Sequence, residues 1–191
     1  MRIPMFPLSI FPLPGELVPL HIFEPRYRQL LNDCESRDIS FGIYFNHDIN
    51  KEKLGSLVKL ESVIKRYQGG ESDIIVKCTD LFHMDTLYRN FRDKLYPGAD
   101  VRFWNVDIQK PVNERLNSEF SEYLSLLKIP GGQSSYSLYQ MANDLSLDFE
   151  ERLRFVLTEP EKQEAFLSSR IRYHILLNKQ VEKSKDIFHL N

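Results

Sequence analysis

In the first half of the chain, hydrophobic and polar residues alternate in short runs rich in β-branched and aromatic side chains, separated by turn-forming residues. The strands that this pattern predicts are residues 5–8, 16–22, 40–45 and 101–106. Two longer alternating runs, 57–67 and 72–79, flank Gly69 and Gly70, which can adopt the positive φ angles of a tight turn, so these runs predict a β-hairpin. In this hairpin Ile64 falls on the face expected to point toward a core.

A single segment of this half has helical periodicity. Between Glu24 and Glu35, Pro25 suits the first turn of a helix. Apolar residues then recur at the spacing of one buried stripe, at Tyr27, Leu30, Leu31 and Cys34. The first two strand candidates each contain proline, which has no N–H to donate, so both strands are expected at sheet edges.

After Pro111 the apolar period changes from that of a strand to that of a helix. Helix-start signals occur at Asn113, at Ser137, at Asp148 with Glu151, and at Thr158 with Glu161. They predict a series of helices, of which the first is stopped by Pro130-Gly131-Gly132 and the last runs toward Lys183. We therefore expect an α+β protein, with a β-rich lobe over residues 1–110 followed by a small antiparallel helical bundle over 111–191.

The charge balance narrows the choice of partners. With 25 Lys and Arg against 27 Asp and Glu the net charge is −2, which argues against a strongly basic surface for nucleic acid. Hydrophobic residues make up 42% and charged residues 27%, as in a folded globular domain. No run of about 18 apolar residues is present and the N-terminus lacks a signal-peptide core, so we expect a cytoplasmic protein without a membrane span.

The sequence lacks the common catalytic motifs. It contains no G-x-x-x-x-G-K-[ST] phosphate loop, no G-x-G-x-x-G dinucleotide loop and no G-x-S-x-G nucleophile elbow. Cys34 and Cys78 form no C-x-x-C pair, and the histidines lack metal-ligand spacing. We therefore expect no catalytic residue, no metal and no cofactor, and we expect both cysteines to be buried. An enzyme would instead need titratable side chains that converge in a pocket.

A mixture of aromatic and basic residues leaves a second function open. The rings are Phe82, Tyr88, Phe91, Tyr96, Phe103 and Trp104, and the cations are Lys77, Arg89, Arg92, Lys94 and Arg102. Such a mixture can stack bases and hold phosphates, as in an RNA-binding protein. The favoured interpretation is that most of the rings pack the β-rich lobe while the charges solvate its rim.

The stretch from Phe6 to Arg28 resembles the opening of the N-terminal, substrate-binding domain of Lon proteases, most specifically over Pro19-Leu-His-Ile-Phe-Glu-Pro-Arg-Tyr27. The resemblance extends more loosely over nearly the whole chain and implies a PUA-like β pseudobarrel for the first lobe. It departs at residues 78–82, where the family often has a glycine and a basic residue before the aromatic. The Walker A loop of the Lon ATPase and the Ser/Lys dyad of its protease are not found, so the resemblance implies a stand-alone, non-catalytic form of the domain.

For such a domain the resemblance implies binding of protein segments. The candidate contacts are apolar side chains that precede the first predicted helix, namely Ile10, Phe11, Leu13, Leu17, Val18 and Phe23. Where they are exposed, they would form a patch for unfolded or extended polypeptide. The expected function is that of an adaptor or a holdase, with a protease or chaperone as a further partner. RNA binding is the alternative, because PUA-like barrels bind RNA in other families, and the oligomeric state is left open.

Overall fold

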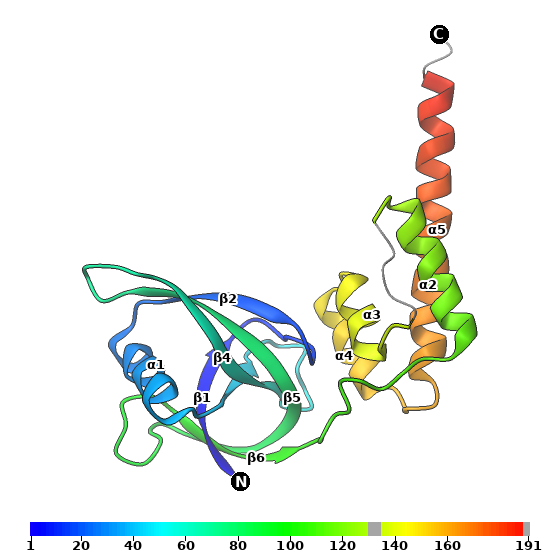
Figure 1. The fold of residues 1–191 in the computed structure, drawn as a ribbon. Coiled ribbons are helices and arrows are strands. Elements are labelled where there is room, and N and C mark those ends of the chain that lie inside the picture. Colours follow the sequence, from blue (N-terminus) through cyan, green and yellow to red (C-terminus); the bar gives the residue numbers. More distant parts are fainter. Residues whose placement is uncertain (130–134, 189–191) are drawn as a thin grey trace. The chain divides into compact units, whose positions relative to one another are not determined.

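The chain divides into two compact units (Figure 1). In a computed structural model, residues 1–129 and 135–188 are described, with side chains as far as residue 180. The first unit, Met1–Ile108, is called the β unit below, and the second, Gln109–Asn191, the helical unit. The boundary predicted from the sequence lies after residue 110.

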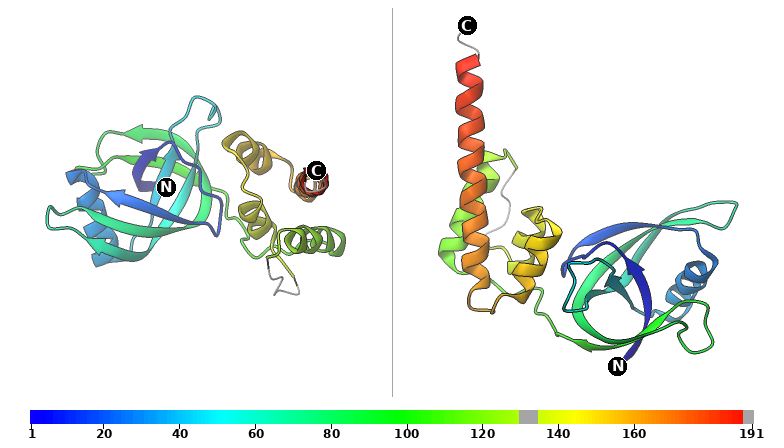
Figure 2. Two further views of the ribbon diagram at one scale, coloured as in Figure 1. Left: turned by 90° about the horizontal axis from the view of Figure 1, so that it is seen from above. Right: turned by 180° about the vertical axis from the view of Figure 1, so that it is seen from behind.

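The strands of the β unit close into a barrel. Its elements are β1 (Arg2–Leu8), β2 (Leu17–Ile22), α1 (Pro25–Arg37), β3 (Phe41–Phe45), β4 (Leu54–Arg66), β5 (Ser72–Tyr88) and β6 (Gly98–Phe103). The strand order is β2-β5-β4-β3-β1-β6, and β5 also pairs with β6. The sheet therefore returns to β5 and forms a ring, which is seen in the left view of Figure 2, while β2 remains attached to β5 as an edge strand. This arrangement confirms the predicted α+β class and its β pseudobarrel.

The proline rule holds for β2 but is wrong for β1. β2 lies at the sheet edge, whereas β1 lies between β3 and β6. β1 tolerates its prolines because neither neighbour pairs with its full length. It is antiparallel to β6 over Arg2–Pro4 and parallel to β3 over Met5–Leu8, so Pro4 has a partner residue only in β6 and Pro7 only in β3, and each proline has a paired neighbour on one side of the strand.

The segment that joins β1 to β2 contributes buried side chains to the core. Phe11 and Leu13 are 1% and 0% exposed. The Phe11 ring stacks on Phe45 with the ring centroids 5.5 Å apart. The Ser56 hydroxyl donates a 2.6 Å hydrogen bond to the carbonyl oxygen of Pro12 and holds the segment in place. The burial of these two apolar side chains therefore contributes to barrel stability.

β-bulges reverse one predicted side-chain direction in the β4–β5 hairpin. The pairing register shifts between Leu60 and Ser62 and again between Val63 and Lys65. Each extra residue moves the following side chains to the opposite face of the strand. As a result Val63 packs against the core, whereas Ile64, predicted to point inward, is 61% exposed.

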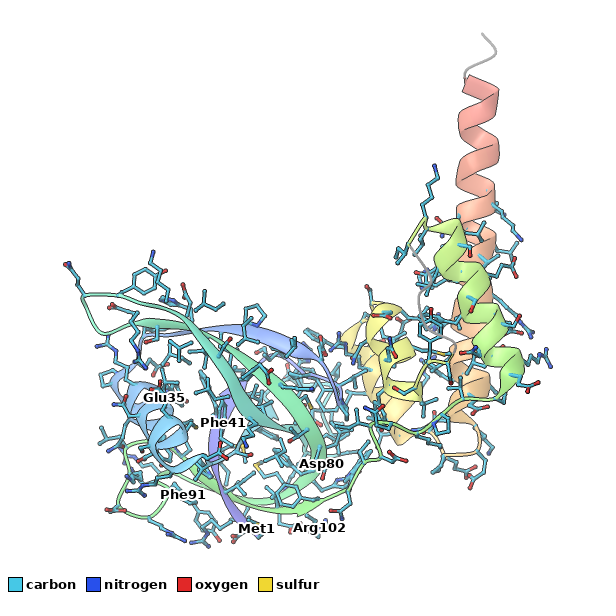
Figure 3. All side chains as sticks on the ribbon, in the orientation of Figure 1. Met1, Glu35, Phe41, Asp80, Phe91 and Arg102 are labelled. Atoms are coloured by element: carbon cyan, nitrogen blue, oxygen red, sulfur yellow. The ribbon has the colours of Figure 1, made fainter. Side chains whose placement is uncertain are left out.

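A buried carboxylate fixes the segment that follows β6. Asp80, labelled on β5 in Figure 3, is 9% exposed. It accepts hydrogen bonds from the backbone N–H groups of Asn105, at 3.1 Å, and Val106, at 3.0 Å. These bonds satisfy the backbone of an irregular segment that has no strand partner. Asp80 lies in the stretch where the sequence departs from the Lon pattern, and its role here is structural.

The helical unit contains α2 (Glu114–Leu126), α3 (Leu138–Asp144), α4 (Phe149–Leu157) and α5 (Gln163–Phe188). The predicted caps of the first three are confirmed. Asn113 and Ser137 each accept a hydrogen bond from the third backbone N–H of their helix, and Asp148 forms the predicted capping box with Glu151. The predicted stop at 130–132 lies outside the described residues.

The predicted start of the last helix is wrong. The hydroxyl of Thr158 donates a 2.6 Å hydrogen bond to the carbonyl oxygen of Arg154, so Thr158 ends α4 and does not begin α5. A turn then follows in which the N–H of Lys162 bonds to the carbonyl oxygen of Glu159, and α5 begins at Gln163. A Thr-x-x-Glu signal is ambiguous when another helix ends at the same threonine.

The two longest helices of this unit are parallel, which corrects the expected antiparallel bundle. Asn113 at the start of α2 bonds to Glu164 at the start of α5. Further along, Glu122 pairs with Lys179 at 3.2 Å. Contacts therefore advance in the same direction along both helices. The physical reason is that α3 and α4 intervene between them in the chain and provide a long crossover.

The buried position of Phe11 predicts a large effect on stability. We expect Phe11→Ala to lower the free energy of unfolding of the β unit by about 3–5 kcal/mol, because it removes a ring from a closed core. Leu17→Ala, at an exposed position, is the matched control and should change it by less than about 0.5 kcal/mol. Urea unfolding followed by the fluorescence of Trp104, the single tryptophan, measures both. Equal effects would contradict this placement of Phe11.

Candidate functional site

The structure separates the six predicted polypeptide-binding residues. Phe11 and Leu13 belong to the core, so the prediction that they contact a polypeptide at the surface is wrong. Ile10 and Val18 are partly buried and pack against the core of the β unit. Leu17 and Phe23 are 54% and 56% exposed. The accessible part of the predicted patch therefore consists of two large apolar side chains, one at each end of β2.

Between these two side chains, β2 presents an open edge. β2 pairs with β5 on one side only. The backbone N–H of Cys78 donates a 2.9 Å hydrogen bond to the carbonyl oxygen of Glu16. This bond shows which residues of β2 direct their main-chain groups toward β5. Because bonded and non-bonded residues alternate in an antiparallel pair, Val18, Leu20 and Ile22 bond to β5.

The main-chain groups of the other residues of β2 point away from β5. These residues are Leu17, Pro19 and His21, and all are exposed. In the described part of the chain no backbone group hydrogen-bonds to their outward side. Two outward N–H groups, of Leu17 and His21, and the outward carbonyl groups of all three residues are thus available to a ligand.

A polar and aromatic cluster lies at the end of this edge. His21 Nδ1 lies 2.6 Å from a carboxylate oxygen of Asp73, and the hydroxyl of Tyr67 donates a 2.6 Å hydrogen bond to the other oxygen. The bond from Tyr67, and then that from His21, lower the pKa of Asp73. The ring of His21 also stacks on Phe23, with the centroids 6.0 Å apart. These contacts hold Phe23 at the surface beside the last outward N–H of the strand.

Part of the basic and aromatic set that suggested RNA binding is occupied by other contacts. Phe82 and Tyr96 are buried, at 0% and 1% exposed. The face of the Tyr88 ring is covered by the Arg2 guanidinium, 4.0 Å from the ring centroid. Arg102 forms an ion pair with Asp85 at 2.9 Å. Core packing and ion pairs therefore occupy several of the groups that base stacking and phosphate binding would need.

Burial makes both cysteines poor nucleophiles. Cys34 and Cys78 are free and buried, as predicted. Burial is the main cause that raises the pKa of the Cys34 thiol to about 12, and it raises that of Cys78 as well. Among the described residues, no three His, Cys, Asp or Glu side chains come together as a metal-binding group. The described helices also contain none with both the length and the apolarity required to span a bilayer.

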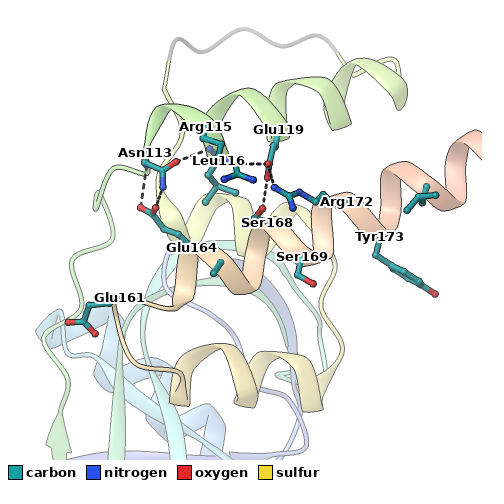
Figure 4. Close-up of a pocket in the computed structure, with 12 residues that line it drawn as sticks. Asn113, Arg115, Leu116, Glu119, Glu161, Glu164, Ser168, Ser169, Arg172 and Tyr173 are labelled. Atoms are coloured by element: carbon teal, nitrogen blue, oxygen red, sulfur yellow. Dashed lines mark hydrogen bonds and ion pairs between the residues drawn. The ribbon is translucent and has the colours of Figure 1, made fainter.

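A groove of about 650 Å³ lies between α2 and α5 in the helical unit (Figure 4). Its centre is Glu119, which accepts hydrogen bonds from Arg172 at 2.6 Å and from the Ser168 hydroxyl at 2.5 Å. Burial alone would raise the pKa of Glu119, but the bonds from Arg172, Ser168 and Arg115 outweigh it and lower the pKa. A carboxylate held ionised in this way is a weak base, so the arrangement does not activate Ser168 as a nucleophile.

This charged network was not predicted from the sequence. Its one local signal is the Arg115–Glu119 pair, which lies four residues apart on one helix face. The partners Ser168 and Arg172 come from α5, and only the parallel packing of the two helices brings them to Glu119. The groove is therefore lined by groups that mainly bond to one another and stabilise the contact between α2 and α5.

Most of the chain matches a known protein family. The family model described as the ATP-dependent protease La (LON) substrate-binding domain matches residues 2–172. The chain belongs to the Lon substrate-binding domain family. The matched region of this Lon domain includes every strand of the β unit and extends into α5. The family resemblance in the sequence is thereby confirmed, and within the protease this domain is the non-catalytic, substrate-binding part.

Solved structures of Lon N-terminal domains have the same fold. A Lon N-terminal domain protein from Xanthomonas campestris is 23% identical, with a TM-score of 0.64 over 83% of this chain and 90% of that chain. The N-terminal domain of the Mycobacterium avium complex Lon protease is 15% identical, with a TM-score of 0.50 over 94% of this chain and 98% of that chain. No curated protein matches the chain.

The burial of the cysteines predicts unreactive thiols. In the native Lon domain at about pH 8, both are expected to resist a disulfide reagent such as DTNB, because the thiolate fraction is small at a raised pKa and the sulfur atoms are inaccessible. Both should react once the chain is unfolded in guanidinium chloride. Release of thionitrobenzoate, followed by absorbance, measures the rates. Fast reaction of either native thiol would contradict its buried position.

The Glu119 network predicts an acid-sensitive helical unit. We expect Glu119→Gln to lower the free energy of unfolding by about 1–2 kcal/mol at neutral pH, because a charged acceptor is lost. A carboxylate with a lowered native pKa stabilises the fold above its unfolded pKa, and this contribution disappears as the pH falls through the native pKa. The difference between the two proteins should therefore shrink as the solution is acidified below the ordinary pKa of 4.5.

Thermal unfolding followed by circular dichroism at several pH values measures this effect. Glu122→Gln is the matched control on the same helix, because its ion pair with Lys179 is about half exposed on both sides. It should have little effect at any pH. A difference between wild type and Glu119→Gln that stays constant down to acid pH would contradict the role of the ionised carboxylate.

Proposed function

We propose that this Lon domain is a non-catalytic polypeptide-binding protein that acts as an adaptor or a holdase for unfolded or extended segments. The observation that carries the proposal is the exposure of Leu17 and Phe23 at the two ends of the open edge of β2. Large apolar side chains gathered beside unpaired main-chain groups are typical of surfaces that bind polypeptide. The family's description as a substrate-binding domain supports the same function.

Polypeptide is favoured over RNA by the chemistry of this surface. Leu17 and Phe23 offer apolar contact area without positive charge. The formal net charge of −2 provides no overall attraction for phosphates. On the β unit, Arg102 is paired with Asp85 and Phe82 is buried, so fewer cations and rings are free to bind phosphates and bases of RNA. A protein client, in contrast, offers both apolar side chains and a main chain.

The proposal is tested by the binding of a fluorescein-labelled, fully reduced and carboxymethylated polypeptide. We expect an increase of fluorescence anisotropy at micromolar concentrations of the Lon domain. Leu17→Ser and Phe23→Ser should each weaken binding about threefold to tenfold, because each removes apolar area that the client would bury. Leu87→Ser is the matched control, since Leu87 is 45% exposed at the far end of β5 from β2. It should bind as the wild type does.

Other outcomes would contradict the proposal. One is the absence of binding at high micromolar concentration; another is equal weakening by all three substitutions. Binding of a single-stranded RNA that falls steeply with salt, without binding of the unfolded polypeptide, would favour RNA as the ligand. Holdase activity would be measured as reduced light scattering of an aggregating client at equimolar Lon domain.

A further inference from the structure

We propose that a client segment binds this Lon domain as an added β-strand, by pairing its main chain with the open edge of β2. This inference rests on the proposed polypeptide-binding function and adds the mode of recognition. It assigns a direct role to the outward main-chain groups of Leu17, Pro19 and His21, whereas Leu17 and Phe23 supply apolar contacts at the two ends.

The arrangement of hydrogen-bonding groups matches an extended chain. Outward groups occur at every second residue of β2, which is the spacing at which another strand presents its own N–H and carbonyl groups. A helix cannot bond to this edge, because its main-chain groups are already paired within the helix. Side chains of a bound strand would alternate between the two faces. Those on the outer face would lie near the exposed side chains of Leu17 and His21.

The edge lacks most of the devices that prevent strand addition. Exposed sheet edges are ordinarily blocked by charged side chains, by bulges, by proline or by a covering segment. β2 contains no Lys, Arg, Asp or Glu, and its pairing with β5 runs without a register shift. Pro19 is the one blocking residue in the strand. It removes a single donor and leaves its own carbonyl group free, so pairing is weakened without being prevented.

Pro19 also decides between two occupants of the edge. In an antiparallel pairing of two β2 strands centred on this position, proline would face proline, and both hydrogen bonds of that pair would be lost. A foreign strand with an ordinary residue there can still donate its N–H to the carbonyl oxygen of Pro19. The edge therefore favours an extended segment of another protein over a second copy of this chain.

Amide hydrogen exchange of the full chain, measured by NMR, tests this mode. The probe is a ten-residue peptide of alternating valine and threonine with a glutamate at each end for solubility. At about ten times its Kd, the peptide should slow exchange of the Leu17 and His21 amides about tenfold. The amides of Val18 and Leu20, which already bond to β5, serve as internal controls and should change little. The same peptide with every amide N-methylated keeps all side chains and is expected to bind at least about tenfold more weakly.

A substitution in the edge provides a second measurement. Pro19→Val restores the missing outward N–H at an exposed position and should tighten binding of the peptide about threefold to tenfold, the effect of one added hydrogen bond. Unchanged or weaker binding by a folded Pro19→Val variant would overturn main-chain pairing. Sedimentation at the same concentration shows whether this variant stays in the same oligomeric state as the wild type.

The outcomes separate this inference from the proposed function. If the peptide binds and the Leu17 and His21 amides keep their exchange rates, strand addition is overturned while polypeptide binding stands. If no peptide or unfolded polypeptide binds, the proposed function fails and this inference fails with it. If the two amides become protected on raising the protein concentration without peptide, the occupant is a second copy and the proposal is overturned.

Discussion

The fold of the β unit depends on the pairing of β5, which shares one of its two edges between β2 and β6. Its other edge pairs with β4 from Ser72 to His83. β2 occupies the first part of the shared edge, over Ser72–Lys77, and β6 occupies the last part, from Phe82 onward. Because β6 also pairs with β1, it closes the ring and leaves β2 outside. The open edge that we interpret as the binding site is thus a direct consequence of barrel closure.

Local signals predicted the elements well, because they depend on neighbouring residues. The buried stripe of α1 and the capping box at Asp148 need only a few residues along the chain, and both are present. Predictions were wrong where the structure depends on residues that are far apart in the sequence. Ile64 is exposed because bulges arise from the pairing of β4 with β5. The parallel direction of α2 and α5 depends on how α3 and α4 are accommodated between them.

The sequence predicted which apolar residues belong to the candidate site, but it did not predict which of them are exposed. Phe11 and Leu17 are both large apolar residues in one proline-rich stretch, and nothing local distinguishes them. Tertiary structure separates them, because the Phe11 ring is buried against Phe45, whereas Leu17 is exposed on an edge strand. The sequence also does not show which residues of β2 bond to β5 and which point their main-chain groups outward. This pattern follows from the bond between Cys78 and Glu16, which joins residues far apart in the sequence.

Pro19 reconciles an open edge with a chain that must not aggregate. An uncharged edge with a complete set of free N–H and carbonyl groups would pair with any extended chain, including another copy of itself. By removing one donor from the middle of β2, proline weakens every pairing and penalises self-pairing twice, since the two prolines then face each other. In the proposed binding mode, what remains is a weak, reversible interaction that gains specificity from apolar contacts at Leu17 and Phe23. Weak reversible binding is what a protein needs in order to hold unfolded segments and release them, because a client that is bound too tightly cannot fold or be passed on.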